Sequence, residues 1–314
     1  MKIIKKIVAV APFQHPDNIN FKTAAYKAWM KIGGATAISH YPPRILHSPA
    51  FRWELPTLHI SCKEARLRFV EPISIKFDTF PDYARYEIIP MVWDCWPSLF
   101  EETCAFFKRH KVKTAFFTSS QTAERMRLRF PDMNIFYIPE GIDTSLYHAG
   151  KELKDRQIDL LEFGRGNEQI VKYELPNGIN HLHSSKDKLL FKNNTELFDS
   201  LANSKITISL PRCDTQPEKA GDIETLTQRY WESMLSRIIM VGRAPQELTN
   251  LIGYNPVVDL DIEYPNEQIV DILAHLDNYQ VLVDRNREIA LNMGDWKIRM
   301  RQVMELLKKC GYTT

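Results

Sequence analysis

Residues 224–248 read ETLTQRYWESMLSRIIMVGRAPQEL and hold two glutamates eight positions apart. Glu224 stands where a polar loop ends, whereas Glu232 follows a tryptophan inside a segment whose apolar residues predict a buried helix. A carboxylate is costly to bury unless it is hydrogen-bonded. The stretch therefore raises the question of what Glu232 binds.

The surroundings of the two glutamates are typical of a ligand site in a parallel sheet. The apolar run 206–210 (ITISL) predicts a strand, the polar loop 211–224 follows it, and a helix is expected from 225 to 236. Ligands of open parallel sheets bind beyond the carboxyl ends of the strands. The first amides and the positive dipole end of a helix favour a phosphate there, and the hydroxyl groups of Thr225 and Thr227 add donors.

Eight helical residues rise about 12 Å, so Glu224 and Glu232 can address different parts of one elongated ligand. A carboxylate that accepts hydrogen bonds from two vicinal hydroxyls suits a ribose, and such a partner would offset the cost of burying Glu232. The alternative is that Glu224 is only a charge at the start of the helix and that Glu232 faces water.

The rest of the chain predicts parallel sheets flanked by helices, because apolar runs rich in β-branched residues alternate with longer helical patterns. Strands are expected at 3–10, 88–93, 115–118, 135–138, 158–163, 206–210, 238–241 and 257–260. Helices are expected at 18–32, 98–109, 120–130, 194–204, 225–236 and 244–252, and residues 265–310 are almost entirely helical in pattern. Residues 41–81 are interrupted by prolines and do not allow an order of elements to be predicted.

A polar, turn-rich stretch at 140–157 predicts a linker, and 314 residues suit about two domains. The expected organisation is an α/β domain over 1–150, a second over 151–294 and a C-terminal helix over 295–314. Trp296, Met300 and Val303 have the spacing of the apolar face of that helix.

Composition excludes several classes of protein. No run of about 18 apolar residues exists, so no membrane span is expected. The N-terminal MKIIKKIVAVAPF has a short apolar run, an immediate proline and no small-residue cleavage site, which indicates a buried strand rather than a signal peptide. The five cysteines are scattered and lack the spacing of a zinc or redox motif, so a reducing cytoplasm is expected.

Charge is distributed unevenly along the chain. Residues 1–147 hold 20 basic and 14 acidic side chains, whereas residues 148–314 hold 21 and 25. The basic half is suited to an anionic inner membrane surface or a phosphorylated acceptor, although random surface variation explains it equally well. Since no basic stripe is interleaved with aromatic residues, nucleic acid is not an expected partner.

Residues 224–248 as a whole resemble the nucleotide-binding signature of GT-B glycosyltransferases, in particular the bacterial group 1 and spore-maturation-like enzymes. The shared pattern is Glu-x7-Glu, a helix with small residues, an apolar strand and a helix that begins near a Glu-Leu pair. The resemblance implies two Rossmann-like, doubly wound domains that face a cleft. It assigns the acceptor to the first domain and the nucleotide sugar to the second, and the C-terminal helix crosses back to the first.

The same resemblance implies roles for individual residues. Glu224 would contact the donor sugar, Glu232 would hold the ribose, and the backbone amides of Thr225, Leu226 and Thr227 would bind the diphosphate. Many relatives have Phe-Gly after the first glutamate, whereas this chain has Thr-Leu-Thr. The missing glycine bears on how closely the diphosphate approaches the backbone.

Two other motifs bear on a phosphate or metal site. The stretch 163–167 (FGRGN) resembles the Gly-Arg turn of the family, so Arg165 is a candidate to neutralise the leaving diphosphate, with an exposed turn arginine as the alternative. Lys172 is the nearest match to the lysine that often follows. Asp259 and Asp261 form an Asp-x-Asp pattern outside the order of elements that metal-dependent glycosyltransferases use, so no metal is expected.

Candidate catalytic residues follow strands of the first half. Asp94 in VWDCWPS lies between two tryptophans, where it could orient an acceptor hydroxyl or take its proton. A core aromatic pair with a helix-capping aspartate is the alternative. His15 follows the first strand and is a second candidate base, and His40 is a weaker one.

The predicted function is transfer of a sugar from a nucleoside diphosphate sugar to a hydroxyl acceptor, a bacterial surface glycan or glycolipid, with retention of configuration favoured. No cofactor is expected. The predicted location is the cytoplasm, with peripheral association at the inner membrane face as a further expectation. The alternatives are a catalytically silent binding subunit, a sugar-nucleotide epimerase and a phosphorylase.

Overall fold

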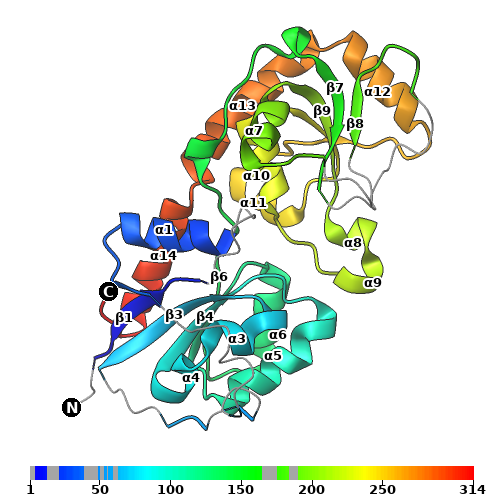
Figure 1. Cartoon of the computed structure of the whole chain (residues 1–314). Helices are drawn as coiled ribbons and strands as arrows, with labels where there is room; N and C mark the ends of the chain where they lie inside the picture. Colours follow the sequence, from blue (N-terminus) through cyan, green and yellow to red (C-terminus); the bar gives the residue numbers. More distant parts are fainter. Residues whose placement is uncertain are drawn as a thin grey trace. The chain divides into compact units, whose positions relative to one another are not determined.

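The structure is a computed structural model that describes residues 4–12, 21–38, 49, 53–54, 56–58, 63–164, 175–183 and 190–314. The chain forms two compact units, each built on one parallel sheet with helices on its faces (Figure 1). The first unit comprises Met1–Glu140, Gln216–Thr225 and Trp296–Thr314, and the second comprises Gly141–Thr215 and Leu226–Asp295. The predicted α/β class with two parallel sheets is confirmed.

The sheet of the first unit has the order β2-β1-β3-β4-β5-β6, and all neighbouring strands are parallel. Its strands are β1 (Lys6–Val10), β2 (Thr36–Ala37), β3 (Glu64–Val70), β4 (Glu87–Val92), β5 (Thr114–Phe117) and β6 (Asn134–Tyr137). Helices α1 (Phe21–Lys31) and α14 (Trp296–Lys309) pack on one face. The other face is covered by α3 (Ile75–Thr79), α4 (Asp82–Arg85), α5 (Pro97–Arg109) and α6 (Ser120–Arg129).

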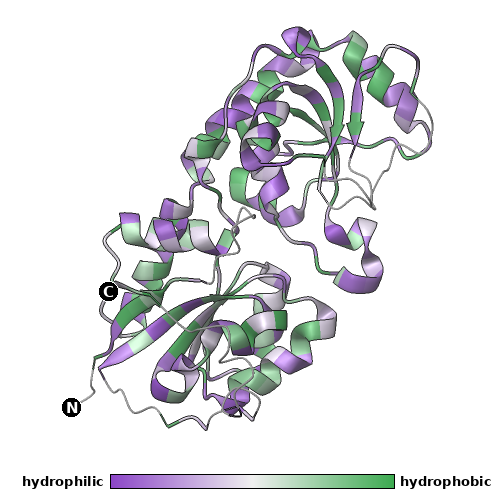
Figure 2. Cartoon of the chain, in the orientation of Figure 1, coloured by the Kyte–Doolittle hydropathy of each residue, from purple (hydrophilic) through white to green (hydrophobic). Residues whose placement is uncertain are grey.

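Strand β4 shows why this sheet has helices on both sides. All six of its residues, EIIPMV, are buried. Ile89 and Met91 join the core beneath α1 and α14, whereas Ile88 and Val92 join the core on the opposite face. Because successive strand residues point to opposite faces, a continuous apolar run needs cover on both. Figure 2 shows hydrophobic residues along the strands of both sheets and both hydrophobic and hydrophilic residues on the surrounding helices.

The sheet of the second unit has the order β11-β10-β9-β7-β8 and is also parallel. Its strands are β7 (Ile158–Glu162), β8 (His181–His183), β9 (Ser204–Ser209), β10 (Ile239–Gly242) and β11 (Val258–Asp259). Helices α7 (Asn194–Ala202), α10 (Gln228–Leu235) and α11 (Gln246–Ile252) contribute to the core on one face. Helix α12 (Pro265–Ala274) contributes to the other, and α13 (Asp277–Met293) to both.

Some elements differ from the sequence-based expectation. Strand β3 lies in the stretch 41–81, which prolines interrupt and for which no order of elements was predicted. Its sequence EARLRFV carries two arginines within an apolar run. One of them, Arg68, is buried and pairs with Asp82 at 3.0 Å. The helix expected from 225 begins at Gln228, since Thr227 is an extended N-cap residue. Residues 216–225, which were assigned to the second domain, pack with the first unit.

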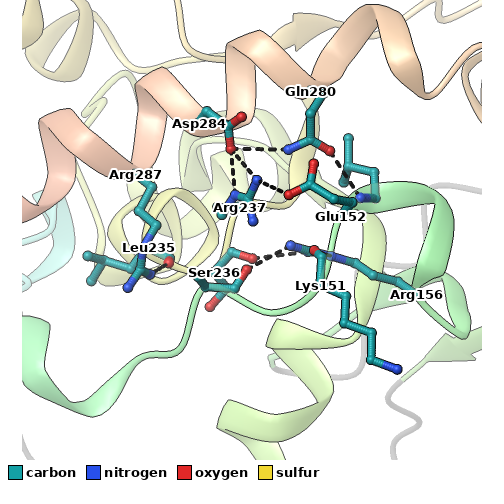
Figure 3. A network of polar contacts seen from close by, with 11 residues as sticks. Lys151, Glu152, Arg156, Leu235, Ser236, Arg237, Gln280, Asp284 and Arg287 are labelled. Atoms are coloured by element: carbon teal, nitrogen blue, oxygen red, sulfur yellow. Dashed lines mark hydrogen bonds and ion pairs between the residues drawn. The ribbon is translucent and has the colours of Figure 1, made fainter.

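A network of arginines anchors the carboxyl end of α10 (Figure 3). Arg156 Nη1 donates to the carbonyls of Ser204 and Ser236 at 2.7 and 3.0 Å. Its other nitrogens donate to the carbonyls of Lys151 and Ala149 at 2.9 and 2.8 Å. Cations near the last carbonyls of a helix also oppose its negative dipole end. The helix that carries Glu232 is therefore fixed at its far end.

Replacing Arg156 with methionine is expected to lower the free energy of unfolding by about 3–5 kcal/mol, because four carbonyl groups lose their donor and Arg156 is only 3 % exposed. Urea denaturation measures this loss. The matched control is Lys154→Met, a change of an exposed neighbouring cation, which should stay within about 0.5 kcal/mol. A loss below about 1 kcal/mol for Arg156→Met would contradict the anchoring role.

Candidate functional site

Glu232 is buried, and the alternative in which it faces water is not what the structure shows. It lies on α10 with 8 % of its surface exposed. The hydroxyl of Tyr147 donates to Glu232 Oε1 at 3.0 Å. Burial raises the pKa of the Glu232 carboxyl, while the Tyr147 hydrogen bond and the charge of Arg229 oppose that shift. A carboxylate has about four acceptor positions, so this one can accept further donors.

Tyr147 is fixed as the donor of this pair. Burial raises the pKa of its hydroxyl far above the ordinary value, and the charge of Glu232 raises it further. The ring packs edge-on against Phe198, with centroids 4.7 Å apart. The hydroxyl therefore keeps its proton at any physiological pH. No sequence pattern pointed to Tyr147, which is 85 positions away from Glu232 in the chain.

The amide of Leu226 is already bonded, which corrects its predicted role as a diphosphate donor. It donates to Glu247 Oε2 at 2.8 Å, and Glu247 is buried at the start of α11. The hydroxyl of Thr225 points elsewhere too, since it contacts the carbonyl of Thr118 at 3.5 Å in the first unit. Of the three residues, only Thr227 stands at the N-cap of α10.

Arg229, to which no sequence pattern pointed, lies beside the carboxyl end of β7. Strand β7 leads directly into Phe163 and Gly164. A Cβ atom on Gly164 would lie 2.3 Å from Arg229 Nη2, so the guanidinium lies directly against this backbone, which has φ +113°. Its central carbon is 5.5 Å from the centroid of the Phe163 ring. The structure thus puts a permanent positive charge at the carboxyl end of β7.

Arg229 and Glu232 form one constellation at the edge of the second sheet. They are three positions apart on α10 and therefore neighbours on its surface. The spacing of Glu224 and Glu232 marks this region in the sequence, whereas the arginine between them belongs to no recognisable pattern. Arg165, the cation predicted from the glycine-rich turn, lies outside the described residues, as does Lys172.

Glu224 is not on a helix, and its surroundings belong to the first unit. Its backbone N–H donates to Gln121 Oε1 at 2.6 Å. Gln121 Nε2 donates to the carbonyl of Asp222 at 2.9 Å. Arg125 Nη2 contacts both carboxylate oxygens of Asp222 at 2.6 and 2.7 Å. The segment that carries Glu224 is therefore attached to α6.

Asp94 lines a small hollow in the first unit, beyond the carboxyl ends of β4 and β5. Its φ of +50° is unusual for a residue other than glycine. The hollow is lined by Val92, Asp94, Cys95, Trp96, Phe117, Thr118, Ser119, Thr122, Ile223 and Thr225. The last two belong to the segment that carries Glu224, so Asp94 lies beside that segment.

The tryptophans on either side of Asp94 are core residues rather than open platforms for a sugar. Trp93 is 2 % exposed and packs against Phe69 and Trp296. Trp96 is 8 % exposed and is itself the N-cap residue of α5. The interpretation of Trp93 and Trp96 as a pair of core residues is therefore confirmed. His15 and His40 lie outside the described residues.

Within the described part of the chain, no group of three or more His, Cys, Asp or Glu side chains is arranged to hold a metal ion. Asp261 accepts hydrogen bonds from the amides of Glu263 and Tyr264 at 2.9 and 3.0 Å, which is a turn-forming arrangement. Among the described residues, no helix combines the length and the apolar character that crossing a bilayer requires.

The chain is similar to solved glycosyltransferase structures over its full length. No family model matches the sequence, and no curated protein matches it significantly. AviGT4, a glycosyltransferase involved in avilamycin A biosynthesis, superposes with a TM-score of 0.55 at 12 % identity, covering 98 % of each chain. Sucrose-phosphate synthase from Thermosynechococcus elongatus gives 0.63 at 11 % identity, covering 98 % of this chain and 99 % of that one. Anabaena HepE in complex with UDP-glucose gives 0.63 at 11 % identity, covering 97 % and 99 %.

These likenesses define the class of fold. Two parallel-sheet α/β units with full-length matches to these enzymes are the GT-B fold, and the predicted fold is confirmed at that level. The finer resemblance to spore-maturation-like enzymes stays a prediction.

Proposed function

We propose that this protein is a glycosyltransferase that moves a sugar from a nucleoside diphosphate sugar to a hydroxyl acceptor. The observation that carries the proposal is the constellation in the second unit, a buried carboxylate one helical turn from an arginine at the edge of the sheet. The GT-B fold and the UDP and UDP-glucose bound to HepE support it.

In the donor half, Glu232 accepts hydrogen bonds from the ribose hydroxyls with the acceptor positions that Tyr147 leaves. Arg229 balances the negative charge of the diphosphate, which grows as the sugar departs. The amides of Thr225 and Thr227 and the side chain of Arg165 stay proposed diphosphate contacts. The Leu226 amide is withdrawn because Glu247 occupies it.

In the first unit, Asp94 orients the acceptor hydroxyl, and His15 stays a second candidate base. Glu224, which also belongs to the first unit, contacts the donor sugar. The acceptor oxygen forms a bond to the anomeric carbon while the bond from that carbon to the β-phosphate oxygen breaks. If configuration is inverted, the hydroxyl proton passes to Asp94; if it is retained, the proton passes to the leaving phosphate oxygen. We favour retention, on the resemblance of the Glu-x7-Glu stretch.

A surface glycan or glycolipid acceptor, and peripheral association with an anionic membrane face, are part of the proposal. The membrane association is supported by the excess of basic over acidic side chains in residues 1–147. The choice of acceptor rests on the resemblance to bacterial group 1 enzymes.

The test is a screen of UDP-, GDP-, ADP- and CMP-sugars for thermal stabilisation and for release of free nucleotide. A ligand at 100 times its Kd is expected to stabilise the fold by about 2.7 kcal/mol. Release of nucleotide that depends on an added acceptor distinguishes a transferase from an epimerase. If no sugar nucleotide stabilises the protein at millimolar concentration, the proposed donor site is wrong.

A further inference from the structure

Helix α6 holds the segment that carries Glu224 through two side chains on one of its faces. Gln121 and Arg125 are four positions apart and therefore neighbours on the helix surface. Gln121 accepts from the Glu224 amide and donates to the Asp222 carbonyl, so it bonds the backbone on both sides of Ile223. Arg125 bonds both oxygens of the Asp222 carboxylate.

We propose that Gln121 and Arg125 are positioning residues that set the location of Glu224 for sugar transfer. The inference rests on the proposed function, because it assumes that Glu224 contacts the donor sugar. It assigns a role to two residues of the first unit that neither the Glu-x7-Glu motif nor the glycine-rich turn includes.

Other contacts of the same segment limit its freedom. A Cβ atom on Gly221, which has φ +58°, would lie 3.1 Å from Pro97 Cγ, so this backbone lies close to the start of α5. Ile223 is 2 % exposed and forms part of the wall of the hollow around Asp94. The Thr225 hydroxyl reaches the carbonyl of Thr118 at 3.5 Å. The attached segment therefore ends at the residue directly before Leu226, whose amide is bonded within the second unit.

Glu224 and Asp94 are consequently held within the same unit of the structure. Both belong to the first unit, and the hollow that Asp94 lines is walled in part by the segment that leads to Glu224. A group that contacts the donor sugar and a group that orients the acceptor must keep a fixed separation for the reacting atoms to meet. The α6 contacts provide that separation within a single unit.

The role is one of geometry rather than of stability. The Asp222 side chain is 73 % exposed and that of Arg125 37 %, and ion pairs this exposed stabilise a fold little. Their two-oxygen geometry nevertheless fixes orientation. A displacement of about 1 Å at a reacting centre can slow catalysis about 100-fold. Loss of the contacts should therefore reduce kcat while leaving folding and nucleotide affinity intact.

The experiment uses the full chain, three single variants of α6, and the charge-reversed pair Arg125→Asp and Asp222→Arg, each alone and both together. Gln121→Met removes both hydrogen bonds at similar volume, Gln121→Glu keeps an acceptor for the Glu224 amide, and Arg129→Ala changes an exposed arginine of the same helix. The donor is whichever of UDP-glucose, GDP-mannose and ADP-glucose binds most tightly to the unmodified protein. Measured quantities are kcat, donor KM, nucleoside diphosphate affinity and hydrogen exchange of peptide 220–226.

For Gln121→Met we expect kcat to fall about 30-fold, with donor KM and nucleotide affinity within about twofold. Gln121→Glu should recover most of kcat, and Arg129→Ala should match the unmodified protein. The double variant Arg125→Asp with Asp222→Arg should exceed either single variant in kcat. Faster exchange of peptide 220–226 in Gln121→Met with unchanged kcat would overturn the proposal, as would a loss of nucleotide affinity equal to the loss of kcat.

Failure of the proposed function gives a different result. In that case the unmodified protein binds and turns over none of the three sugar nucleotides. Exchange of peptide 220–226 then still decides whether α6 holds the segment, because faster exchange in Gln121→Met and not in Arg129→Ala supports the attachment. Equal exchange in the two variants would contradict it.

Discussion

Replacing Glu232 with alanine is expected to weaken nucleoside diphosphate binding about 100-fold, equivalent to about 2.7 kcal/mol. The ribose hydroxyls would lose a charged acceptor, and the Tyr147 hydroxyl, which now donates to Glu232 Oε1, would be left without its partner. Isothermal titration with UDP, GDP and ADP measures the change. The matched control is Glu267→Ala, an exposed glutamate of α12 in the same unit, which should leave affinity unchanged.

The pH dependence of binding gives this prediction a second readout. The Glu232 carboxylate must be ionised to accept two hydroxyl donors. Burial raises its pKa above the usual glutamate value of about 4.3. Affinity should therefore fall as the pH is lowered, and the fall should begin at a higher pH than an ordinary glutamate would give. Glu232→Gln cannot titrate and should remove this part of the profile. An unchanged profile in Glu232→Gln would show that another group governs binding.

The raised pKa of Glu232 affects the stability of the free protein in the opposite direction, because raising the pH lowers stability while it favours ligand binding. A carboxyl whose pKa is higher in the folded state contributes stability below its unfolded pKa and loses that contribution as the pH rises through the folded value. Ionised Glu232 is thus unfavourable in the free protein, and hydroxyl donors of a ligand offset that penalty. A buried carboxylate therefore indicates a ligand more strongly than an exposed one does.

The sequence predicted the regular parts of the fold because their signals are local. Strand β4 is an almost continuous apolar run, β9 alternates isoleucine with polar residues, and α5 and α6 begin within one residue of their expected starts. Strand β3 was not predicted, because prolines interrupt the stretch around it. The pairing of Arg68 with Asp82 makes its charged residue compatible with burial. That compensation comes from a residue 14 positions away and leaves no local trace.

The burial of Glu232 was predicted from the sequence, whereas its neighbours in the tertiary structure were not. Spacing and apolar neighbours singled out Glu232, but its donor Tyr147 and the neighbouring cation Arg229 follow only from the tertiary structure. The start of α10 was placed too early for a similar reason. The Leu226 amide has an acceptor in Glu247, so an extended residue precedes the helix where a further helical turn was expected.

Replacing Arg229 with methionine is expected to reduce kcat about 100-fold or more, because the departing diphosphate would lose a preorganised positive charge. Affinity for nucleoside diphosphates should fall as well, whereas affinity for the corresponding nucleosides, which lack phosphate, should not change. Steady-state kinetics and titrations with UDP and uridine, or with the matching pair for the preferred base, measure both effects. The comparison between the two ligands separates loss of charge from loss of the site.

Two further variants decide how Arg229 acts. Arg229→Lys keeps the charge but not the planar guanidinium that lies against Gly164, so it should recover only part of kcat. Arg285→Met removes another arginine of the second unit, which stacks 3.8 Å from the Tyr254 ring centroid, and should leave kinetics unchanged. If Arg229→Met bound diphosphate as tightly as the unmodified protein, the cation at the end of β7 would have no part in holding the donor. The diphosphate would then have to be neutralised by another group, of which Arg165 is the one the sequence favours.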